Sequence, residues 1–260
     1  LMFNEELIAA KVASRNAGKI LMEFFSKKNK EIEMKGVDNP VTIADKKADT
    51  YLYKFLSGEF PDDGWLSEET VDTEERLSKD KVWIVDPLDG TKEFIEGVPH
   101  FAVSIALVKN GEPVVGVIYN PAKNEMFSCE KGKGVYFNGS KTKVSSKKLL
   151  TESSIIVSRS EIKRGEWDSY KNQFSLIKPI GSVAYKLALV SAGKNDIFAT
   201  IAPKNEWDIC AGDCLVNEAG GTFKTINDKK IIYNQKKTLV TDTIIASNST
   251  LFEGVTDLLF

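Results

Sequence analysis

The sequence predicts an α+β protein, and the order of its secondary-structure signals carries that prediction. Two amphipathic helical patterns come first, short β-rich segments separated by turn residues follow, and strands alternate with helices towards the C-terminus. The chain has 260 residues, of which 42% are hydrophobic, and can therefore bury a substantial core. We expect one compact unit with two halves, residues 1–150 and residues 151–260.

The N-terminal region predicts a helix and a loop. Apolar residues recur at helical spacing over residues 5–27, which we interpret as a scaffold helix. Residues 35–40 are expected to form a loop, because Pro40 favours an extended conformation at the residue before it.

A second helix is expected over residues 42–60. Thr42 and Asp45 at its start have the spacing of a capping box, in which each residue satisfies a free backbone N–H of the other. Helix capping alone can therefore explain Asp45.

The middle and the end of the chain alternate apolar runs with turn signals. Two hairpins are indicated by Asn110-Gly111 and Asn138-Gly139. Strands are expected at 65–67, 82–85, 102–108, 113–119, 125–128, 154–157, 196–200 and 238–246, and helices at 164–174, 183–192, 209–219 and 251–260.

The segment WIVDPLDGTKEF suggests a site of chemistry. A short apolar, β-branched strand runs directly into Asp86 and Asp89, whose carboxylates would repel each other unless something neutralised them. A divalent cation held by Asp86, Asp89 and the carbonyl of Leu88 removes that repulsion. Gly90 and Thr91 would open the next helix, whose free amides favour an anion such as phosphate. The alternative is that Asp89 only caps a helix and Asp86 is a solvated residue at a strand end.

Other segments place polar groups at strand ends or helix starts. Glu68 follows the predicted strand 65–67, although adjacent glutamates are usually solvated. Ser158 and Arg159 follow a strand, where they could meet an anion or belong to a polar loop. Lys186 lies about one turn into a predicted helix, and its side chain can reach back towards the helix start.

Composition excludes several classes of protein. The net charge of −2 gives no support for binding a nucleic acid polymer or a membrane surface. No apolar run approaches the roughly 20 residues of a transmembrane segment, and charged residues interrupt the N-terminal apolar positions, so neither an anchor nor a signal peptide is expected. The three cysteines form no disulfide framework and fit a cytoplasmic location. The single histidine, His100, excludes multi-histidine metal sites and is expected to pack in a loop.

Four motifs together resemble the inositol monophosphatase superfamily of magnesium-dependent, lithium-inhibited phosphatases. They are V-T-I-A-D at 41–45, L-S-E-E at 66–69, D-P-L-D-G-T at 86–91, and W-D-I-C-A-G at 207–212 with E-A-G-G at 218–221. The likeness covers most of the chain, and the pair D-P-L-D-G-T and W-D-x-x-A-G is highly specific.

Within the superfamily, K-E-F at 92–94 resembles the 3'(2'),5'-bisphosphate nucleotidase (CysQ-type) branch. Inositol monophosphatases proper usually carry asparagine before that phenylalanine. Ser158-Arg159-Ser160 resembles an element of the nucleotidases, but Glu161 stands where a histidine often follows. One residue more than in some relatives separates Gly181-Ser182 from Lys186.

The resemblance implies a layered α/β/α/β/α sandwich with an antiparallel first sheet and a mixed second sheet. It implies two or three Mg²⁺ ions per site and assigns the following metal ligands: Glu68, Asp86, the Leu88 carbonyl, Asp89 and Asp208.

The resemblance also assigns roles in catalysis and binding. Asp45 and Thr91 match the pair that activates water, with Glu68 beside them as a catalytic residue. The residues expected to contact the substrate are Gly90, Thr91, Ser158, Arg159, Lys186 and Asp208.

The expected activity is phosphomonoester hydrolysis by metal-activated water, without a covalent phosphoenzyme. The favoured substrate is adenosine 3',5'-bisphosphate or 3'-phosphoadenylyl sulfate, cleaved at the 3'-phosphate. The alternative is an inositol monophosphatase or a broader sugar phosphatase on the same centre. A more distant alternative is a non-catalytic protein that binds metal or phosphate. The only partner expected is a small phosphorylated substrate, and the chain could be a monomer or a homodimer.

Overall fold

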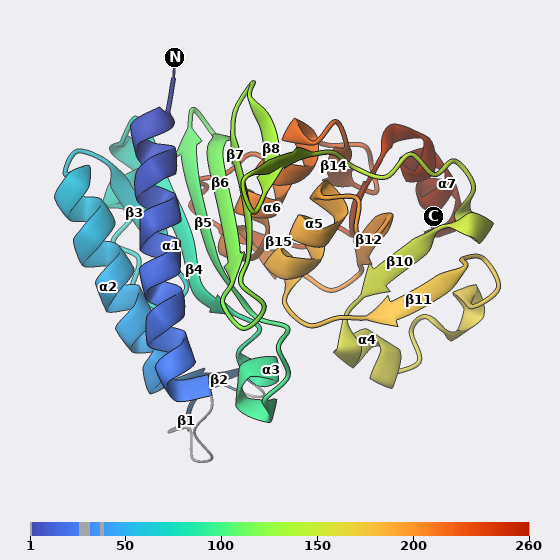
Figure 1. Cartoon of the computed structure of the whole chain (residues 1–260), viewed down its shortest axis with the longest axis horizontal. Helices are drawn as coiled ribbons and strands as arrows, with labels where there is room; N and C mark the ends of the chain where they lie inside the picture. The colour runs from blue at the N-terminus through green and yellow to red at the C-terminus, as the bar shows by residue number, and fades with distance from the viewer. Residues whose placement is uncertain (1, 26–31, 37–38, 260) are drawn as a thin grey trace.

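The computed structural model describes residues 2–25, 32–36 and 39–259. Its elements stack in five layers (Figure 1). Helices α1 (Asn4–Phe25) and α2 (Ile43–Glu59) cover one face of a seven-stranded sheet. Helices α5 (Val183–Ser191) and α6 (Glu206–Glu218) separate this sheet from a five-stranded sheet, and α7 (Ser249–Leu259) covers the outer face of the latter. The predicted layered α+β sandwich is confirmed.

The first sheet has the strand order β3-β4-β5-β6-β7-β8-β9. Neighbouring strands are antiparallel, as expected, except that β3 and β4 run parallel. The strands are β3 (Gly64–Ser67), β4 (Lys81–Asp89), β5 (Ala102–Lys109), β6 (Glu112–Asn120), β7 (Glu125–Glu130), β8 (Gly134–Phe137) and β9 (Ser140–Thr142).

The second sheet is mixed, as expected, with the order β11-β10-β12-β16-β14. Strand β10 pairs in parallel with β11 and β12, and β16 pairs antiparallel with β12 and β14. Its strands are β10 (Ser154–Val157), β11 (Leu176–Pro179), β12 (Ile197–Thr200), β14 (Thr222–Thr225) and β16 (Ile244–Ser247). The short strands β13 (Lys204–Asn205) and β15 (Leu239–Val240) form a separate pair.

Strand β4 shows why its sequence is a continuous apolar run. Trp83 and Val85 pack in the core under α1 and α2, whereas Val82 and Ile84 pack in the core that contains α5 and α6. Because side chains alternate along a strand, Asp86 points to the same side as Val82 and Ile84. That side is where α6 lies, and the alternation therefore aims Asp86 at the layer between the two sheets.

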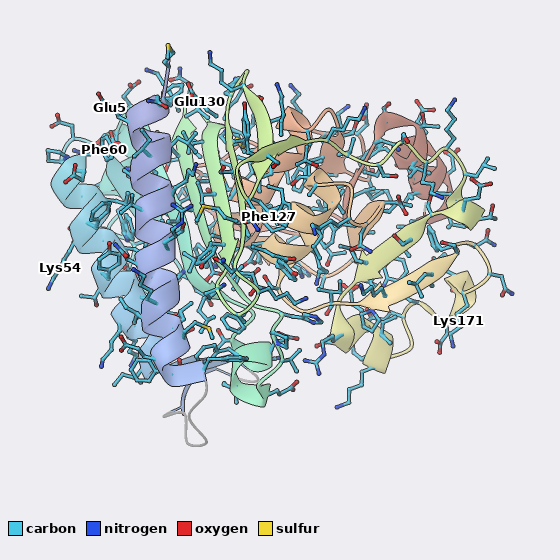
Figure 2. All side chains as sticks on the ribbon, viewed as in Figure 1. Glu5, Lys54, Phe60, Phe127, Glu130 and Lys171 are labelled. Carbon is cyan, nitrogen blue, oxygen red and sulfur yellow. The ribbon has the colours of Figure 1, made fainter. Side chains whose placement is uncertain are left out.

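Three apolar clusters fill the spaces between the layers. Phe127 of β7 is fully buried and lies at the centre of the molecule, on the side of the first sheet that faces α5 and α6 (Figure 2). At the rim of the sheet, Glu130 accepts a hydrogen bond from the backbone N–H of Phe3, just before α1, at 2.7 Å. All three cysteines are free and buried, and Cys210 and Cys214 are core residues, as expected.

Several sequence-based boundaries were wrong. The expected helix over 164–174 is replaced by α4 (Arg159–Lys163) and a short 3-10 turn at Asp168–Tyr170. Gly165 adopts a φ of 75°, a left-handed conformation that stops a helix, and it lies inside the expected range.

The expected loop over 35–40 was also wrong in part, because β1 (Ile32–Gly36) and β2 (Asn39–Thr42) form a hairpin there; residues 37–38 lie outside the described ranges. Residues 26–27 of the first expected helix lie outside them as well. The expected strand over 238–246 is divided between β15 and β16. Across residues 2–25, 32–36 and 39–259, none of the helices has the length and apolar character needed to cross a bilayer.

Candidate active site

Acidic side chains from two elements meet at the end of β4. One carboxylate oxygen each of Asp86, Asp89 and Asp208 lies within 4.8 Å of the others. Burial raises the pKa of all three carboxyl groups, and the charges of neighbouring carboxylates, that of Glu68 among them, raise the pKa values of Asp86 and Asp208 further. A buried cluster of like charges is unfavourable unless protons or a cation neutralise it. Three convergent carboxylates are a donor set that fits a hard cation such as Mg²⁺.

Each member of this carboxylate cluster (Asp86, Asp89 and Asp208) is held by a backbone hydrogen bond. Asp86 Oδ1 accepts from the N–H of Leu88 at 3.0 Å. Asp208 Oδ2 accepts from the N–H of Asn205 at 2.8 Å, within a capping box that starts α6. In each of these two residues the structural bond occupies one oxygen and leaves the other for a cation.

Asp89 connects the two halves of the chain. Its Oδ2 accepts hydrogen bonds from the hydroxyl of Ser182 and from the N–H of Ala184, both at 2.6 Å. These donors begin α5, so a residue of β4 caps a helix 95 positions away in the sequence. The sequence-based alternative, a helix cap at Asp89, is therefore correct for one oxygen, but the capped helix is α5 and not the next helix.

Glu68 follows β3 and reaches the same edge of the sheet as Asp86, because β3 and β4 are parallel neighbours. Its backbone N–H donates to the carbonyl of Val85 at 3.3 Å. Its side chain lines the same cavity as the carboxylate cluster but is not one of the three carboxylates that lie within 4.8 Å of one another. Its assignment as a metal ligand stays a prediction.

The predicted pair of Asp45 and Thr91 is in contact. The Thr91 hydroxyl donates to Asp45 Oδ1 at 3.0 Å and lies 3.1 Å from the carbonyl oxygen of Leu88. The other oxygen, Oδ2, accepts from the N–H of Thr42 at 2.8 Å and from the Thr42 hydroxyl, which completes the capping box of α2. The capping interpretation of Asp45 is therefore confirmed for Oδ2, whereas Oδ1 is in contact with Thr91 and its catalytic role stays a prediction. Burial raises the pKa of Asp45, although its hydrogen bonds oppose that shift.

Gly90 forms the turn between β4 and α3 (Thr91–Glu96). Its φ is 95°, and a Cβ at this position would lie 2.7 Å from the carbonyl oxygen of His100. Only glycine fits this left-handed, crowded conformation without strain. The contact of the Gly90 and Thr91 amides with a phosphate stays a prediction.

A cavity of about 240 Å³ opens over these groups. Beyond the acids and the Gly90–Thr91 turn, it is lined by basic and hydroxyl side chains from both halves of the chain: Lys92, Ser158, Ser160, Ser182, Lys186 and Lys204. A pocket lined by both carboxylates and lysines suits a phosphate bridged to metal ions.

Lys186 lies in the wall of this cavity and is almost completely buried. Its ammonium group donates to the carbonyl of Ile180 at 3.0 Å. Burial lowers its pKa to about 8, and the charge of Asp89 opposes that shift. Near neutral pH Lys186 is therefore still mainly protonated.

Arg159 points to other acids. Its Nη1 pairs with Glu93 Oε1 at 3.1 Å and with Glu96 Oε2 at 2.7 Å. Its contact with substrate stays a prediction, but these two carboxylates already neutralise its charge. Glu161, in place of the expected histidine, is buried and accepts hydrogen bonds from Trp167 Nε1 and the Thr200 hydroxyl, both at 3.0 Å.

Sequence analysis missed three residues that shape the site. Ser182 holds Asp89, and Glu93 lines the cavity. Asp49 of α2 accepts hydrogen bonds from the hydroxyls of Ser67 and Thr70, on either side of Glu68. A signal for Asp49 was present, since it follows Asp45 by one helical turn.

Comparisons with known proteins show which chains this one is similar to. A model described as "Inositol monophosphatase family" matches residues 4–259. The "Inositol-1-monophosphatase" of Mesorhizobium japonicum is 38% identical over 217 residues, which cover 80% of this chain and 81% of that protein. The "Fructose-1,6-bisphosphatase/inositol-1-monophosphatase" of Thermotoga maritima is 34% identical over 223 residues, which cover 83% of each chain.

Solved structures give the same result. The inositol monophosphatase structure from Thermotoga maritima superposes with a TM-score of 0.87 at 31% identity and covers 98% of this chain and 96% of that chain. The extragenic suppressor protein SuhB of Bartonella henselae superposes with a TM-score of 0.85 at 32% identity and covers 98% of both chains.

Proposed function

The chain belongs to the inositol monophosphatase family of phosphatases, and we propose that it hydrolyses small phosphomonoesters with Mg²⁺ held at the carboxylate cluster. The single observation that carries this proposal is the convergence of Asp86, Asp89 and Asp208 beside the Asp45–Thr91 hydrogen bond. When bound, Mg²⁺ would lower the pKa of a water molecule and offset charge on the leaving oxygen.

Thr91 and Asp45 would handle the proton of the attacking water. The Thr91 hydroxyl donates to Asp45, so its lone pairs remain able to accept a hydrogen bond from a water molecule. As that water loses its proton, Thr91 passes its own proton to Asp45 Oδ1. Burial raises the pKa of Asp45 and makes its carboxylate a better base than an exposed aspartate.

The remaining groups would hold the phosphate. The N–H groups at Gly90 and Thr91 begin α3 and can take part of the negative charge on the transferring phosphoryl group. Lys92 and Lys204 line the same cavity and add positive charge. None of these residues has to form a covalent bond to phosphorus, so the reaction is direct hydrolysis.

For the alcohol part of the substrate, we favour an inositol or sugar monophosphate. Two of the compared relatives carry inositol-1-monophosphatase in their names. A second phosphate calls for further cations, which Arg159, Lys186 and Lys204 could supply. Of these, Arg159 is already paired with Glu93 and Glu96. The second candidate is the 3'-phosphate of adenosine 3',5'-bisphosphate, favoured by the buried ammonium group of Lys186 in the cavity wall.

Release of inorganic phosphate tests both candidates. The purified chain is assayed with inositol 1-phosphate and with adenosine 3',5'-bisphosphate, with Mg²⁺ and with EDTA, and with Li⁺ as a third condition. We expect release from at least one substrate, dependent on Mg²⁺ and reduced by Li⁺, and the ratio of the two kcat/KM values selects the substrate. If phosphate were released in EDTA at the rate seen with Mg²⁺, the reaction would not depend on a metal ion.

A further inference from the structure

Glu93 lines the active-site cavity where the two halves of the chain meet. It belongs to α3, and its Oε1 accepts a hydrogen bond from Arg159 of α4, a short helix at the same edge of the molecule (Figure 1). The side chain of Glu93 is 13% exposed, whereas that of Glu96, the second partner of Arg159, is 52% exposed and is not part of the cavity lining.

The backbone of Gly181 fixes where the Glu93 carboxyl group can lie. A Cβ at Gly181 would overlap Cδ and Cγ of Glu93, so the absence of a side chain at Gly181 makes room for this carboxyl group. Gly181 directly precedes Ser182, whose hydroxyl binds Asp89 of the carboxylate cluster. Glu93 is therefore held on one side by the Arg159 guanidinium and on the other by the backbone that leads into α5.

One oxygen of Glu93 is left for a ligand. Arg159 occupies Oε1, and within the part of the chain that the structure describes, Oε2 has no hydrogen-bond donor. Oε2 is also absent from the buried polar atoms that lack a partner, so it is accessible to solvent, and Glu93 is one of the residues that line the cavity. Because an ionised carboxylate only accepts hydrogen bonds, Oε2 calls for a donor from whatever fills the cavity.

We propose that Glu93 is a specificity-determining residue whose Oε2 accepts a hydrogen bond from a hydroxyl group on the alcohol part of the substrate. The inference rests on the proposed phosphatase activity and narrows its substrates to phosphomonoesters that carry a free hydroxyl near the ester carbon. When a substrate without that hydroxyl binds, the carboxylate oxygen is desolvated and has no donor. The site should therefore discriminate strongly against such a substrate.

A pair of substrates that differ by one hydroxyl group tests the proposal. The enzyme with Mg²⁺ is assayed with cyclohexyl phosphate and with cis- and trans-2-hydroxycyclohexyl phosphate. The kcat/KM of each hydroxylated isomer is then divided by the kcat/KM of cyclohexyl phosphate. We expect the wild type to prefer one hydroxylated isomer by about ten- to hundredfold, the range of a hydrogen bond to a charged group. Turnover of cyclohexyl phosphate reports on the fold and the metal centre.

Matched variants assign the preference to Glu93. In Glu93→Met the preference should fall to less than about threefold while turnover of cyclohexyl phosphate persists, because only the hydrogen-bond acceptor is lost. Glu96→Met removes the other partner of Arg159 from the same helix and should keep the wild-type preference. If Glu93→Met folds poorly, Glu93→Gln serves instead. Arg159 can only donate, so the amide turns its oxygen to Arg159 and its Nε2 to the cavity. The substrate hydroxyl can then only accept from a neutral donor, and the preference should fall to about two- to tenfold, the range of a hydrogen bond between neutral groups.

The outcomes separate this inference from the proposed function. A wild type that hydrolyses all three compounds with equal kcat/KM overturns the role of Glu93 and leaves the phosphatase intact. The same holds if Glu93→Met keeps the wild-type preference. A wild type that releases phosphate from none of these compounds, from inositol 1-phosphate or from adenosine 3',5'-bisphosphate at saturating Mg²⁺ refutes the proposed function, and this inference with it.

Discussion

Replacing Asp45 by asparagine should disturb two tasks that one carboxylate performs at once. Oδ2 accepts from the N–H and the hydroxyl of Thr42 at the start of α2, and Oδ1 accepts from Thr91 in the active site. An amide cannot replace both oxygens, because its Nδ2 is a donor and must face either Thr42 or Thr91. The variant therefore loses either the helix cap or the oxygen that accepts the Thr91 proton.

The structure gives a magnitude for each loss. Loss of the cap at Asp45, which is almost completely buried, should lower the free energy of unfolding by about 1–3 kcal/mol. For a chain of this size each kcal/mol corresponds to roughly 2–4 °C in Tm. Loss of the proton acceptor beside Thr91 should lower kcat by about 10²- to 10⁴-fold even if the cap survives, because the amide is no longer a base.

Thr42→Ala is the matched control. It removes the Thr42 hydroxyl from the cap and leaves the hydrogen bond between Thr91 and Asp45 in place. We expect a loss of about 1 kcal/mol in the free energy of unfolding and less than tenfold in kcat.

The assay combines denaturant unfolding with phosphate release at saturating Mg²⁺ for both variants. If Thr42→Ala lowered kcat as much as Asp45→Asn does, the loss of activity would be due to the disturbed start of α2. Proton transfer from Thr91 to Asp45 would then not explain it. Near wild-type kcat in Asp45→Asn would refute the assigned role of Asp45.

Three further predictions follow from other parts of the site and the core. Asp89→Asn should lower kcat by about 10²-fold or more at saturating Mg²⁺, and phosphate release at the wild-type rate would contradict its role as a ligand. Asp49→Ala should raise the Mg²⁺ concentration needed for half-maximal rate, and kcat should recover at high Mg²⁺. The reason is that Asp49 does not bind the ion but positions the segment around Glu68. An unchanged Mg²⁺ dependence would exclude this role. Burial raises the pKa of Asp213 to about 7, although the hydrogen bonds that its carboxylate accepts from Tyr233 and Asn217 lower that pKa. Asp213 therefore holds more protons in the folded chain than in the unfolded chain between about pH 4 and 7, and its contribution to stability falls as the pH rises through this window. Asp213→Asn should flatten that fall in unfolding titrations, and an identical pH profile in the variant would contradict the shift.

Short-range signals in the sequence predicted much of the fold. The continuous apolar run before Asp86 predicted a strand buried on both faces, and β4 confirms it. The helical periodicity of residues 5–27 and the capping box at Thr42 predicted α1 and α2 to within a few residues. These signals depend on interactions between residues a few positions apart, which a linear sequence displays directly.

The sequence was less informative where glycine conformation or sheet pairing decided the outcome. Apolar residues at helical spacing predicted a helix over 164–174, but Gly165 adopts a left-handed conformation and α4 ends before it. The hairpin of β1 and β2 was missed because both strand signals are short. Ile32–Gly36 alternates apolar and polar residues over only four positions, and Asn39–Thr42 contains Pro40, which weakens a strand signal.

For the candidate site, the sequence by itself determined which residue types gather and in which local setting: acids at the ends of two strands, and an acid in the first turn of α2 and of α6. The tertiary structure alone decided how each oxygen is used. It placed Ser182 on Asp89, and Arg159 on Glu93, 66 positions apart in the sequence. Such pairs form because two sheets and the helices between them bring distant segments face to face. Since that juxtaposition depends on the packing of the whole chain, no local pattern encodes it.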